Sequence, residues 1–567
     1  MILKAMISDA ALIRELKAIA GTGQVIADGR GIRRFTRGFR SGEGSAVAVV
    51  RPGSLVELWR LARACVRAGR IIILQAANTG VTGGSTPDGV YDRGVVILNT
   101  MRLKGVHMLN GGAQVLCLPG TTLQELEREL RSLQRESHSE MGSTWLSASV
   151  IGGVCNSSGG VLVRRGPAYT EAALYAQVDE TGDLRLVNEL GMDLGRDPEE
   201  QLESLERGEF FRVLNDLHVR VCSAHGYLEQ VRDVDAHSPA RFNADPRYLN
   251  GASGSAGRLI VFAVRLDTFP RPATTHVFHL ATDDPGVLTD IRRRMLGEAA
   301  LVPISAEYMH RDMFQMAARY GKDTFIAVWM LGASRLGPLL RFKEAVDGLA
   351  SRLGLGRVHL TDHLLQGFSK LAPPHLPEAF RERGERYAHH LFLKVDGEQL
   401  GAARALLSDM MPPLKGACHE FTPEEGKKAF LHRFTAACVT NRYTALVKEA
   451  EDRLVGLDVA LRRNDKAWWY VLPDHLKAMV EHTLVYGHFF CHVFHQDFIL
   501  KKGADAAAFR RGMLAHYAAR GAECPGECNV GQVHKAKPEL AAFYRKLDPT
   551  NTLNPGLGKT SRNKDWK

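Results

Sequence analysis

The chain has 567 residues, more than a single hydrophobic core usually organises, so we expect two or three domains. Apolar residues make up 45% of the chain and charged residues 24%, a balance that excludes a disordered or fibrous protein. The formal net charge of +10 suits an acidic metabolite, an anionic lipid surface or nucleic acid. Because the chain has no block of Lys and Arg and no aromatic-basic ladder, we expect no nucleic-acid partner.

The sequence also gives expectations about the compartment. Nine cysteines are scattered without a pairing pattern, which is typical of reduced thiols in a cytosolic protein. Residues 1–21 carry acidic side chains early and lack a long apolar run, so we expect no signal peptide. No stretch of about 18 apolar residues occurs, so any contact with a membrane should be peripheral.

The first half of the chain alternates helices and strands. Residues 9–20 have helical periodicity, and Ser54 and Glu57 have the spacing of a capping box for a helix that runs to residue 68. An amphipathic helix is expected at residues 121–133. The expected strands lie at residues 46–50, 70–77, 95–100 and 114–120. This alternation of helices and strands continues to residue 268.

A glycine-rich loop follows the second of these strands. Its sequence, QAANTGVTGGS at residues 75–85, consists almost entirely of small side chains, which let backbone N–H groups approach a phosphate. The loop matches neither GxGxxG nor the P-loop pattern. It predicts a phosphate-binding loop, with an exposed turn as the plainer alternative.

A second stretch of small residues, MGSTWLSASVIGGVCNSSGG, covers residues 141–160 and carries almost no charge. Two such loops about 65 residues apart, each after a strand–helix unit, suit a dinucleotide whose pyrophosphate is held between two sheets. The alternative is a pair of tight turns in one core.

Beyond Pro270 and Pro272, which mark a boundary, the composition changes. Between residues 331 and 386, nine Lys and Arg alternate with leucine-rich patches and outnumber six Asp and Glu, a net charge of +3. Basic groups near anionic lipid and inserted leucines both favour membrane binding, so this stretch is the candidate membrane-contacting segment. An ordinary solvated helical segment is the alternative. A strand pattern resumes at residues 389–395.

The order of these segments makes a resemblance specific. The segments RPGSLVELWRLARACVRAGRIIILQAANTG, VVILNTMRL, LPGTTLQELEREL and SVIGGVCNSSGG resemble the vanillyl-alcohol-oxidase, or PCMH-type, FAD-binding fold. Within that superfamily the chain resembles the bacterial quinone-dependent D-lactate dehydrogenases, through stretches such as RRGPAYTE, PARFNADP, EYMHRD, TPEEGKKAFLHRF, VFHQDF and NPGLGKTS. The matching stretches run in order from residue 39 to residue 561.

This resemblance implies an α+β fold with a split, two-subdomain PCMH-type FAD-binding domain and a sheet-based cap. We expect the FAD-binding domain at residues 1–268, completed by 520–567, and the cap at 269–519 with a basic membrane-binding insertion at 311–387. The resemblance also implies non-covalent FAD, D-lactate as substrate and a membrane quinone as electron acceptor. It further implies peripheral attachment to an anionic membrane surface, at the cytoplasmic face of the bacterial inner membrane.

Carried over by position, the flavin site should draw on both small-residue loops and on one strand. The expected residues are Ala76, Ala77, Asn78, Thr79, Gly80, Gly84, Ser85, Gly142, Ser149, Gly159 and Val261, with Asn554 near the cofactor.

Oxidation of a 2-hydroxy acid needs a base, a cation for the carboxylate and a group that polarises the hydroxyl. Related FAD-linked dehydrogenases place a carboxylate-binding Arg in an ALR segment and a metal-binding YGH…H pair after it. By this resemblance Arg462 or its neighbour Arg463 is the carboxylate clamp, and His488 and His495 are the pair. With Glu527, these histidines could hold a divalent metal. Hydrogen-bonded core histidines are the alternative.

The chain departs from these relatives in two places. Where they carry a Gly-Asp-Gly-Asn turn between the histidines, this chain has FFCHVF, and in a flat strand residues seven apart face opposite sides. His488 and His495 therefore meet only if a bulge or bend intervenes. The second departure is Cys528, which replaces a His beside Glu527 and leaves the identity of the base open. His310 and Arg311 are further polar candidates, with a surface ion pair as the alternative.

These features predict a flavoprotein oxidoreductase that oxidises D-lactate to pyruvate and reduces a quinone. The first alternative is the same chemistry on another D-2-hydroxy acid. The second is a non-catalytic flavin-binding protein, which the predicted cluster of Arg and His residues argues against.

Overall fold

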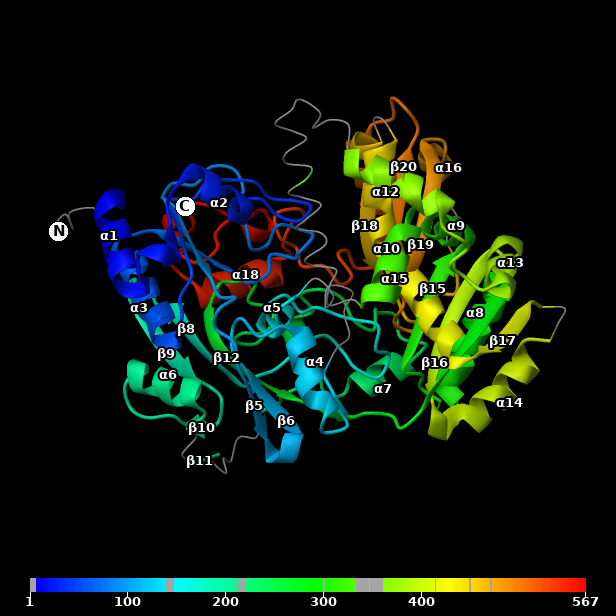
Figure 1. Cartoon of the computed structure of the whole chain (residues 1–567), viewed down its shortest axis with the longest axis horizontal. Helices are drawn as coiled ribbons and strands as arrows, with labels where there is room; N and C mark the ends of the chain where they lie inside the picture. Colours follow the sequence, from blue (N-terminus) through cyan, green and yellow to red (C-terminus); the bar gives the residue numbers. More distant parts are fainter. Residues whose placement is uncertain are drawn as a thin grey trace.

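A computed structural model describes residues 7–138, 147–209, 212–213, 220–298, 301–332, 346, 360–412, 415–447, 450–469 and 472–567. The protein has two lobes (Figure 1). One lobe combines the N-terminal half with the C-terminal end, and the other is built from the middle of the chain. The fold is α+β, as the sequence predicts.

The first sheet lies in the N-terminal lobe and has the order β1-β2-β4-β3. Its strands are β1 (Val25–Ile26), β2 (Ala48–Val50), β3 (Ile71–Gln75) and β4 (Val95–Asn99). The last three are parallel, and β1 is antiparallel to β2. The helices beside it are α1 (Asp9–Ala20), α2 (Gly29–Thr36) and α3 (Leu55–Arg67). Ser54 caps α3 as expected, but Glu57 accepts from the N–H of Gly53, so the capping box is not closed at Ser54.

The second sheet is antiparallel, with the order β5-β6-β12-β8-β9. Its strands are β5 (Val106–Leu109), β6 (Gln114–Cys117), β8 (Ala173–Val178), β9 (Leu184–Asn188) and β12 (Ile260–Asp267). The helices of this part are α4 (Leu123–Arg131), α5 (Val150–Cys155), α6 (Pro198–Arg207) and α7 (Tyr227–Arg232). Two short ladders pair β7 (Arg135–Glu136) with β13 (Phe269–Pro270) and β10 (Met192–Asp193) with β11 (Arg212–Val213).

The C-terminal end returns to this lobe. After α18 (Pro538–Leu547), Leu553 pairs in parallel with Ile72 and is fully buried in the core that joins the two sheets. The Arg258 guanidinium donates to Asn551 Oδ1 at 2.5 Å. This return agrees with a split FAD-binding domain, while the limits at residues 268 and 520 stay a prediction.

The second lobe contains a seven-stranded antiparallel sheet with the order β17-β14-β16-β15-β19-β20-β18. Its strands are β14 (Thr275–Thr282), β15 (Ser305–His310), β16 (His389–Asp396), β17 (Ala417–Phe421), β18 (Leu454–Ala460), β19 (Val480–His488) and β20 (Val493–Leu500). Side chains alternate between two buried cores, so helices cover both faces.

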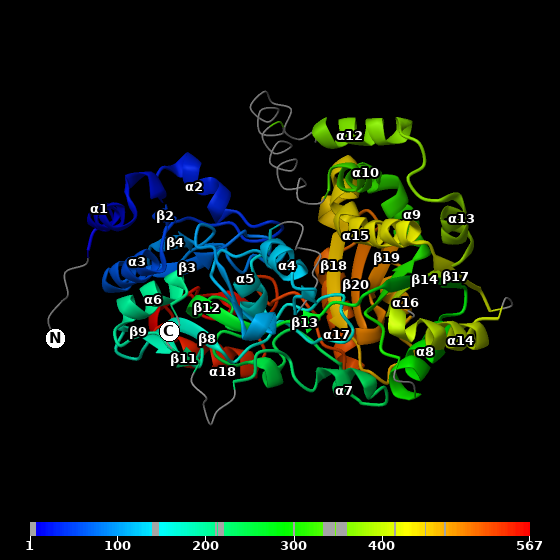
Figure 2. The same cartoon turned by 60° about the horizontal axis from the view of Figure 1, so that its bottom comes forward.

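One face packs against α8 (Pro285–Arg293), α14 (Leu400–Met410), α16 (Asp474–Lys477) and α17 (Ala506–Ala519). The other face packs against α9 (Arg311–Tyr320), α13 (Glu378–Arg386) and α15 (Pro423–Leu446). Helices α10 (Lys322–Leu331) and α12 (Leu360–Leu371) lie outside this layer, with α12 outermost (Figure 2). In the described part of the chain, no helix combines the length and apolar character that crossing a bilayer requires.

Candidate active site

A cavity of about 1010 Å³ lies between the two lobes. One side of its wall comes from the loop at residues 75–85, from α5 with the loop after it, and from β12. The other side comes from α15 and from strands β18, β19 and β20. The end of α10 and the segment at residues 527–534 also line it.

The cavity brings together the residues predicted to bind the flavin. Ala76, Ala77, Asn78, Thr79, Gly80, Gly84, Ser85, Ser149, Gly159, Val261 and Asn554 all line it. Gly142 lies outside the described residues. The two small-residue loops, far apart in the sequence, therefore face one common space.

The first of these loops is held by its own polar side chains. Asn78 has φ 56°, donates through Nδ2 to the carbonyl of Arg37 at 3.0 Å and accepts from Ser85 Oγ at 2.9 Å. A Cβ at Gly80 would meet no atom within 4 Å, whereas one at Gly84 would lie 2.6 Å from Asn529. Side-chain contacts thus hold the loop in place, and the space beside Gly80 stays open for a pyrophosphate. On this geometry the cavity fits FAD.

His488 and His495 lie on the two strands of a tight hairpin. Strand β19 ends at His488, a short helical turn (η10, Phe489–Cys491) follows, and His492 adopts φ 54° before β20 begins. In this register Tyr486 pairs with His495, so both histidines point to the same face. Their ring centroids lie 5.3 Å apart. The bend that the sequence requires is therefore a complete chain reversal.

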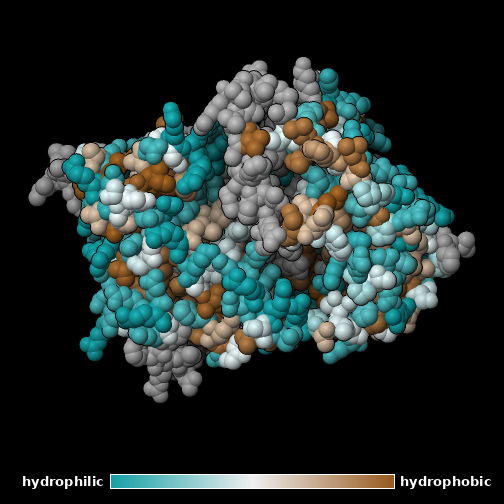
Figure 3. Space-filling view, viewed as in Figure 1, coloured by the Kyte–Doolittle hydropathy of each residue, from teal (hydrophilic) through white to brown (hydrophobic). Residues whose placement is uncertain are grey.

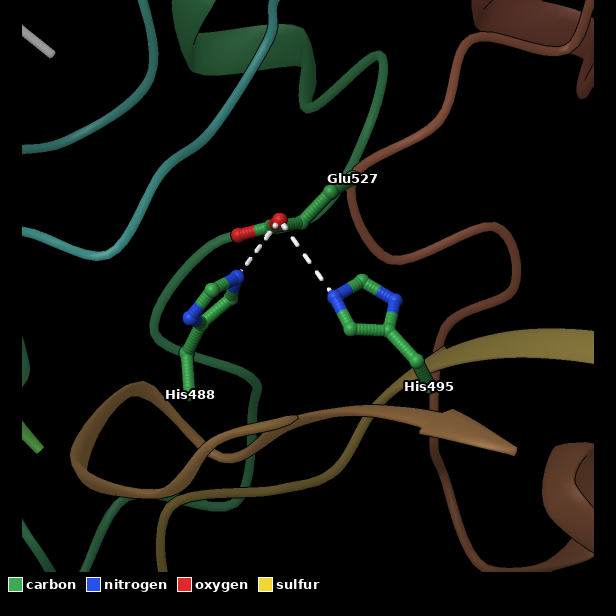
Figure 4. Close-up of side chains that lie close together, drawn as sticks. All are labelled: His488, His495 and Glu527. Carbon is green, nitrogen blue, oxygen red and sulfur yellow. Dashed lines mark ion pairs between the residues drawn. The ribbon is translucent and has the colours of Figure 1, made fainter. Parts of the chain in front are cut away.

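Glu527 faces both histidines (Figure 4). Its Oε2 lies 3.1 Å from His488 Nε2 and 3.9 Å from His495 Nε2, and its Oε1 pairs with the buried Arg241. One ligand atom from each of the three residues lies within 4.8 Å of the others. This is the one such group of three or more His, Cys, Asp or Glu side chains among the described residues.

A second carboxylate stands behind each histidine. Glu307 on β15 accepts from His488 Nδ1 at 2.6 Å, and Asp458 on β18 lies 3.3 Å from His495 Nδ1. Asp458 also accepts from the N–H groups of Glu527 and Cys528, each at 2.7 Å. Both histidines are therefore oriented with Nε2 toward Glu527.

These charges set the protonation of the site. Burial opposes a charge on His488, but the Glu307 and Glu527 carboxylates outweigh it and raise the pKa of His488 to about 10. Burial likewise opposes the charge on Glu527, yet His488 and Arg241 hold the pKa of Glu527 well below its usual value. At neutral pH the protonated His488 and the ionised Glu527 therefore form an ion pair.

The two predicted carboxylate clamps do not reach this cavity. After β18 ends at Ala460 the chain turns away, and Arg462 pairs with Pro239 while its carbonyl oxygen lies 2.9 Å from His492 Nδ1 behind the hairpin turn. The buried Arg463 donates to Ser238 O at 3.0 Å and also to Gln230 O. We therefore correct the prediction: neither guanidinium lines the site.

Arg433 on α15 does line the cavity. Its guanidinium lies 4.5 Å from the centre of the Tyr486 ring and 2.8 Å from Glu307 Oε2. Its Nε has no hydrogen-bond partner among the described residues. Arg433 is thus a buried cation at the cavity wall with donor capacity to spare.

Cys528 also lines the cavity, but burial raises the pKa of its thiol well above the usual value, so it stays neutral. His310 does not line the cavity: its side chain caps α9 by accepting from the N–H of Asp312. Glu307, Asp458 and Arg433 line the cavity but are not among the residues that the sequence predicts there. The available signal was an acid inside an apolar strand, Glu307 in ISAEYMH and Asp458 in VGLDVAL.

Comparisons with known proteins agree with this geometry. The sequence family described as FAD binding domain matches residues 46–184, and the family described as D-lactate dehydrogenase, membrane binding, matches residues 277–566. Over almost its whole length the chain folds like p-cresol methylhydroxylase with substrate bound, with a TM-score of 0.58 and 12% identity, covering 97% of this chain and 96% of that one. At that identity the likeness shows the PCMH-type fold alone.

Curated relatives are far more similar. The chain is 48% identical to the quinone-dependent D-lactate dehydrogenase of Escherichia coli (strain K12) over 562 residues, 98% of each chain. It is also 48% identical to the quinone-dependent D-lactate dehydrogenase of Haemophilus influenzae (strain ATCC 51907 / DSM 11121 / KW20 / Rd), over 98% of this chain and 99% of that one. With identity of this degree from end to end, the chain belongs to the quinone-dependent D-lactate dehydrogenase family.

Proposed function

We propose that this protein oxidises D-lactate to pyruvate and delivers the two electrons to a membrane quinone. The observation that carries the proposal is the single cavity in which the FAD-binding loops face His488, His495 and Glu527. Bound FAD would take up the hydride from Cα of the substrate. The polar cluster would bind the hydroxyl and carboxylate groups beside it.

We propose that the small residues of both loops hold the pyrophosphate of non-covalently bound FAD. Gly80→Val would place a side chain in the open space in front of the first loop, so the purified variant should lack flavin. Gly23→Val is the matched control, because a Cβ at this exposed glycine also meets nothing within 4 Å but lies outside the cavity. Equal flavin content in both variants would contradict the assignment.

We propose Arg433 as the cation that binds the substrate carboxylate. Its guanidinium is buried at the cavity wall, and a guanidinium can bind a carboxylate with two parallel hydrogen bonds. Its contact with Glu307 fixes its position at the cavity wall.

We also propose that His488, His495 and Glu527 bind one divalent cation. Atoms that coordinate a tetrahedral zinc at 2.0–2.2 Å lie about 3.4 Å apart. Here the two separations from Glu527 are 3.1 and 3.9 Å, and all three ligand atoms lie within 4.8 Å of one another. Glu307 and Asp458 hold the outer nitrogen of each histidine, as outer-shell carboxylates do at metal sites. The cation would polarise the substrate hydroxyl and ease its loss of a proton.

The membrane contact is proposed to rest partly on basic residues. Five of them, Arg335, Arg341, Lys343, Arg352 and Arg357, lie outside the described residues. If anionic lipid attracts them, co-sedimentation with anionic vesicles should fall with salt and fall when all five are changed to Gln. Equal binding by both proteins would contradict this part. Attachment at the cytoplasmic face belongs to the same proposal.

Steady-state turnover on a panel of hydroxy acids tests the substrate. D-Lactate should give the highest kcat/KM with a quinone acceptor, above longer D-2-hydroxy acids. A higher kcat/KM for another D-2-hydroxy acid would keep the chemistry and replace the substrate.

A further inference from the structure

Helix α12 has its polar and apolar faces the wrong way round for a surface helix. It buries Thr361, Asp362, Gln366 and Ser369, and it exposes Leu364, Leu365, Phe368 and Leu371. The buried polar face is anchored: Arg442 Nε lies 2.9 Å from Asp362, and Gln366 donates to the carbonyl of Arg319 at 3.0 Å. The apolar face, with Phe368 69% and Leu371 85% exposed, is thereby held outward.

The end of α10 extends this apolar surface. Trp329, Met330 and Leu331 are 42%, 74% and 41% exposed, and α10 contacts α12. Together the two helices carry seven of the twelve large apolar side chains that are exposed in the described part of the chain. Figure 3 shows hydrophobic atoms gathered over the upper part of this lobe, where α10 and α12 lie. Such a concentration marks a surface for lipid or for an apolar ligand.

The apolar surface continues into the flavin cavity. Trp329 and its neighbour Val328 belong to the cavity wall. Beside them, Phe430, Leu431 and Phe434 on one side of α15 are only partly buried, although they lie in the middle of a helix, because they face the same cavity. An apolar wall therefore runs from the exposed ends of α10 and α12 toward the loops at residues 75–85.

We infer that this wall is the docking site of the membrane quinone. The isoprenoid tail would lie on the outer face of α10 and α12, and the ring would enter along Trp329, Phe430 and Phe434. The inference rests on the proposed function and adds the location of its electron acceptor. In the overall reaction D-lactate loses two electrons and two protons and becomes pyruvate, and the quinone gains both and becomes the quinol. An anionic hydroxy acid gains nothing from an apolar wall, whereas a lipid-soluble quinone is stabilised by it.

The first test compares two electron acceptors on the holoenzyme. Trp329→Ser and Phe430→Ser should each lower the ratio of turnover with decylubiquinone to turnover with ferricyanide by about tenfold, the size expected for losing a central aromatic contact. Leu133→Ser is the matched control, because Leu133 is 43% exposed and lies outside the cavity. Its ratio should equal that of the wild type. Turnover with ferricyanide also reports that each variant is folded and holds flavin.

The second test reads binding without turnover. A ubiquinone with a short tail should quench tryptophan fluorescence in the wild type, and Trp329→Phe should lose part of that quenching. Unchanged acceptor ratios in both serine variants, or equal quenching with and without Trp329, would overturn the inference. A third outcome would also overturn the inference: Phe368→Ser converts a dimer into a monomer but leaves the ratio of decylubiquinone to ferricyanide turnover unchanged. The exposed face of α12 would then bind a second copy of the chain.

The outcome for the proposed function is separate. If D-lactate fails to bleach the flavin of the wild type without oxygen, the proposed function fails. If bleaching is normal and the acceptor ratios do not change, only the docking site fails.

Discussion

Two clusters of histidines lie on the same face of the seven-stranded sheet, and they differ in their partners. In the first, Glu307 and Asp458 stand behind His488 and His495, and Glu527 stands in front. In the second, below α13 and α15, His279 Nε2 lies 3.2 Å from His390 Nδ1, and Arg383 donates to His279. Among the described residues no carboxylate hydrogen-bonds to His279, His390 or His432.

The partners decide the protonation state. Burial, with a smaller contribution from neighbouring basic groups, lowers the pKa of His390 and of His432 to about 3, so both stay neutral and serve as packing groups. Flanking carboxylates raise the pKa of His488 to about 10 despite equal burial. The same residue type on one sheet thus stays neutral where it meets only rings and cations, and becomes charged where carboxylates flank it beside a cavity.

The largest effect is expected at Glu527. Glu527→Gln removes the negative charge between His488 and Arg241, so kcat/KM for D-lactate should fall by about 1,000-fold, about 4 kcal/mol in the barrier. Steady-state kinetics with flavin content measured in parallel gives the answer. His432→Leu, in the neutral cluster, is the control and should keep the wild-type kcat/KM. Similar losses in both variants would erase the contrast.

The next effect is expected at Arg433. Arg433→Ala should lower kcat/KM by about 2–4 kcal/mol in barrier terms, mainly through a higher KM, because the substrate carboxylate loses its cation. Arg433→Lys should restore part of this, since an ammonium lacks the planar fork. Arg462→Ala is the matched control and should have wild-type kinetics. The reverse result, with Arg462→Ala impaired and Arg433→Ala normal, would return the role to the predicted residue.

A smaller effect is expected at the carboxylate behind His488. Glu307→Gln keeps the size of the side chain but weakens its hold on Nδ1, so metal affinity and kcat/KM should fall by about 10–100-fold. Metal analysis of the purified protein and titration with a chelator check the first quantity. A metal-free wild type with full activity would leave His488 and His495 as hydrogen-bonding groups and defeat the metal proposal.

The smallest effect concerns stability in the neutral cluster. Because the pKa of His432 is about 3 when folded and about 6.5 when unfolded, the unfolded chain alone binds this proton between those values. The free energy of unfolding should therefore fall by about 2 kcal/mol from pH 7 to pH 5 through this residue, and His432→Leu should remove that part of the fall. Urea unfolding at the two pH values measures it. An identical fall in wild type and variant would contradict burial of a neutral imidazole.

Much of the fold and of the flavin site could be predicted from the sequence, because both depend on local patterns. Glycine-rich loops after strands favour a phosphate site, and the residues named in them, apart from Gly142, face one cavity. The catalytic side depends on long-range register. That His488 and His495 share a face follows from the chain reversal at His492, which carries no Gly or Pro signal.

The position of Arg462 and Arg463 outside the cavity has the same origin. The resemblance places the ALR segment at the substrate, but β18 ends at Ala460, and Arg462 and Arg463 follow the turn away from the cavity. Arg433, which takes their place at the cavity wall, comes from a helix that is distant in sequence. Its position depends on how α15 packs on β15 and β19 through Glu307 and Tyr486, and no local pattern reports such a contact.

The most direct test of the central claim is anaerobic mixing of the flavin-loaded protein with each lactate enantiomer, followed by the flavin absorbance. D-Lactate should bleach the flavin in the wild type and in His432→Leu, and L-lactate should not. His488→Ala, in the carboxylate-flanked cluster, should bleach far more slowly with D-lactate. Bleaching by neither enantiomer, or equal rates in His488→Ala and His432→Leu, would contradict the account.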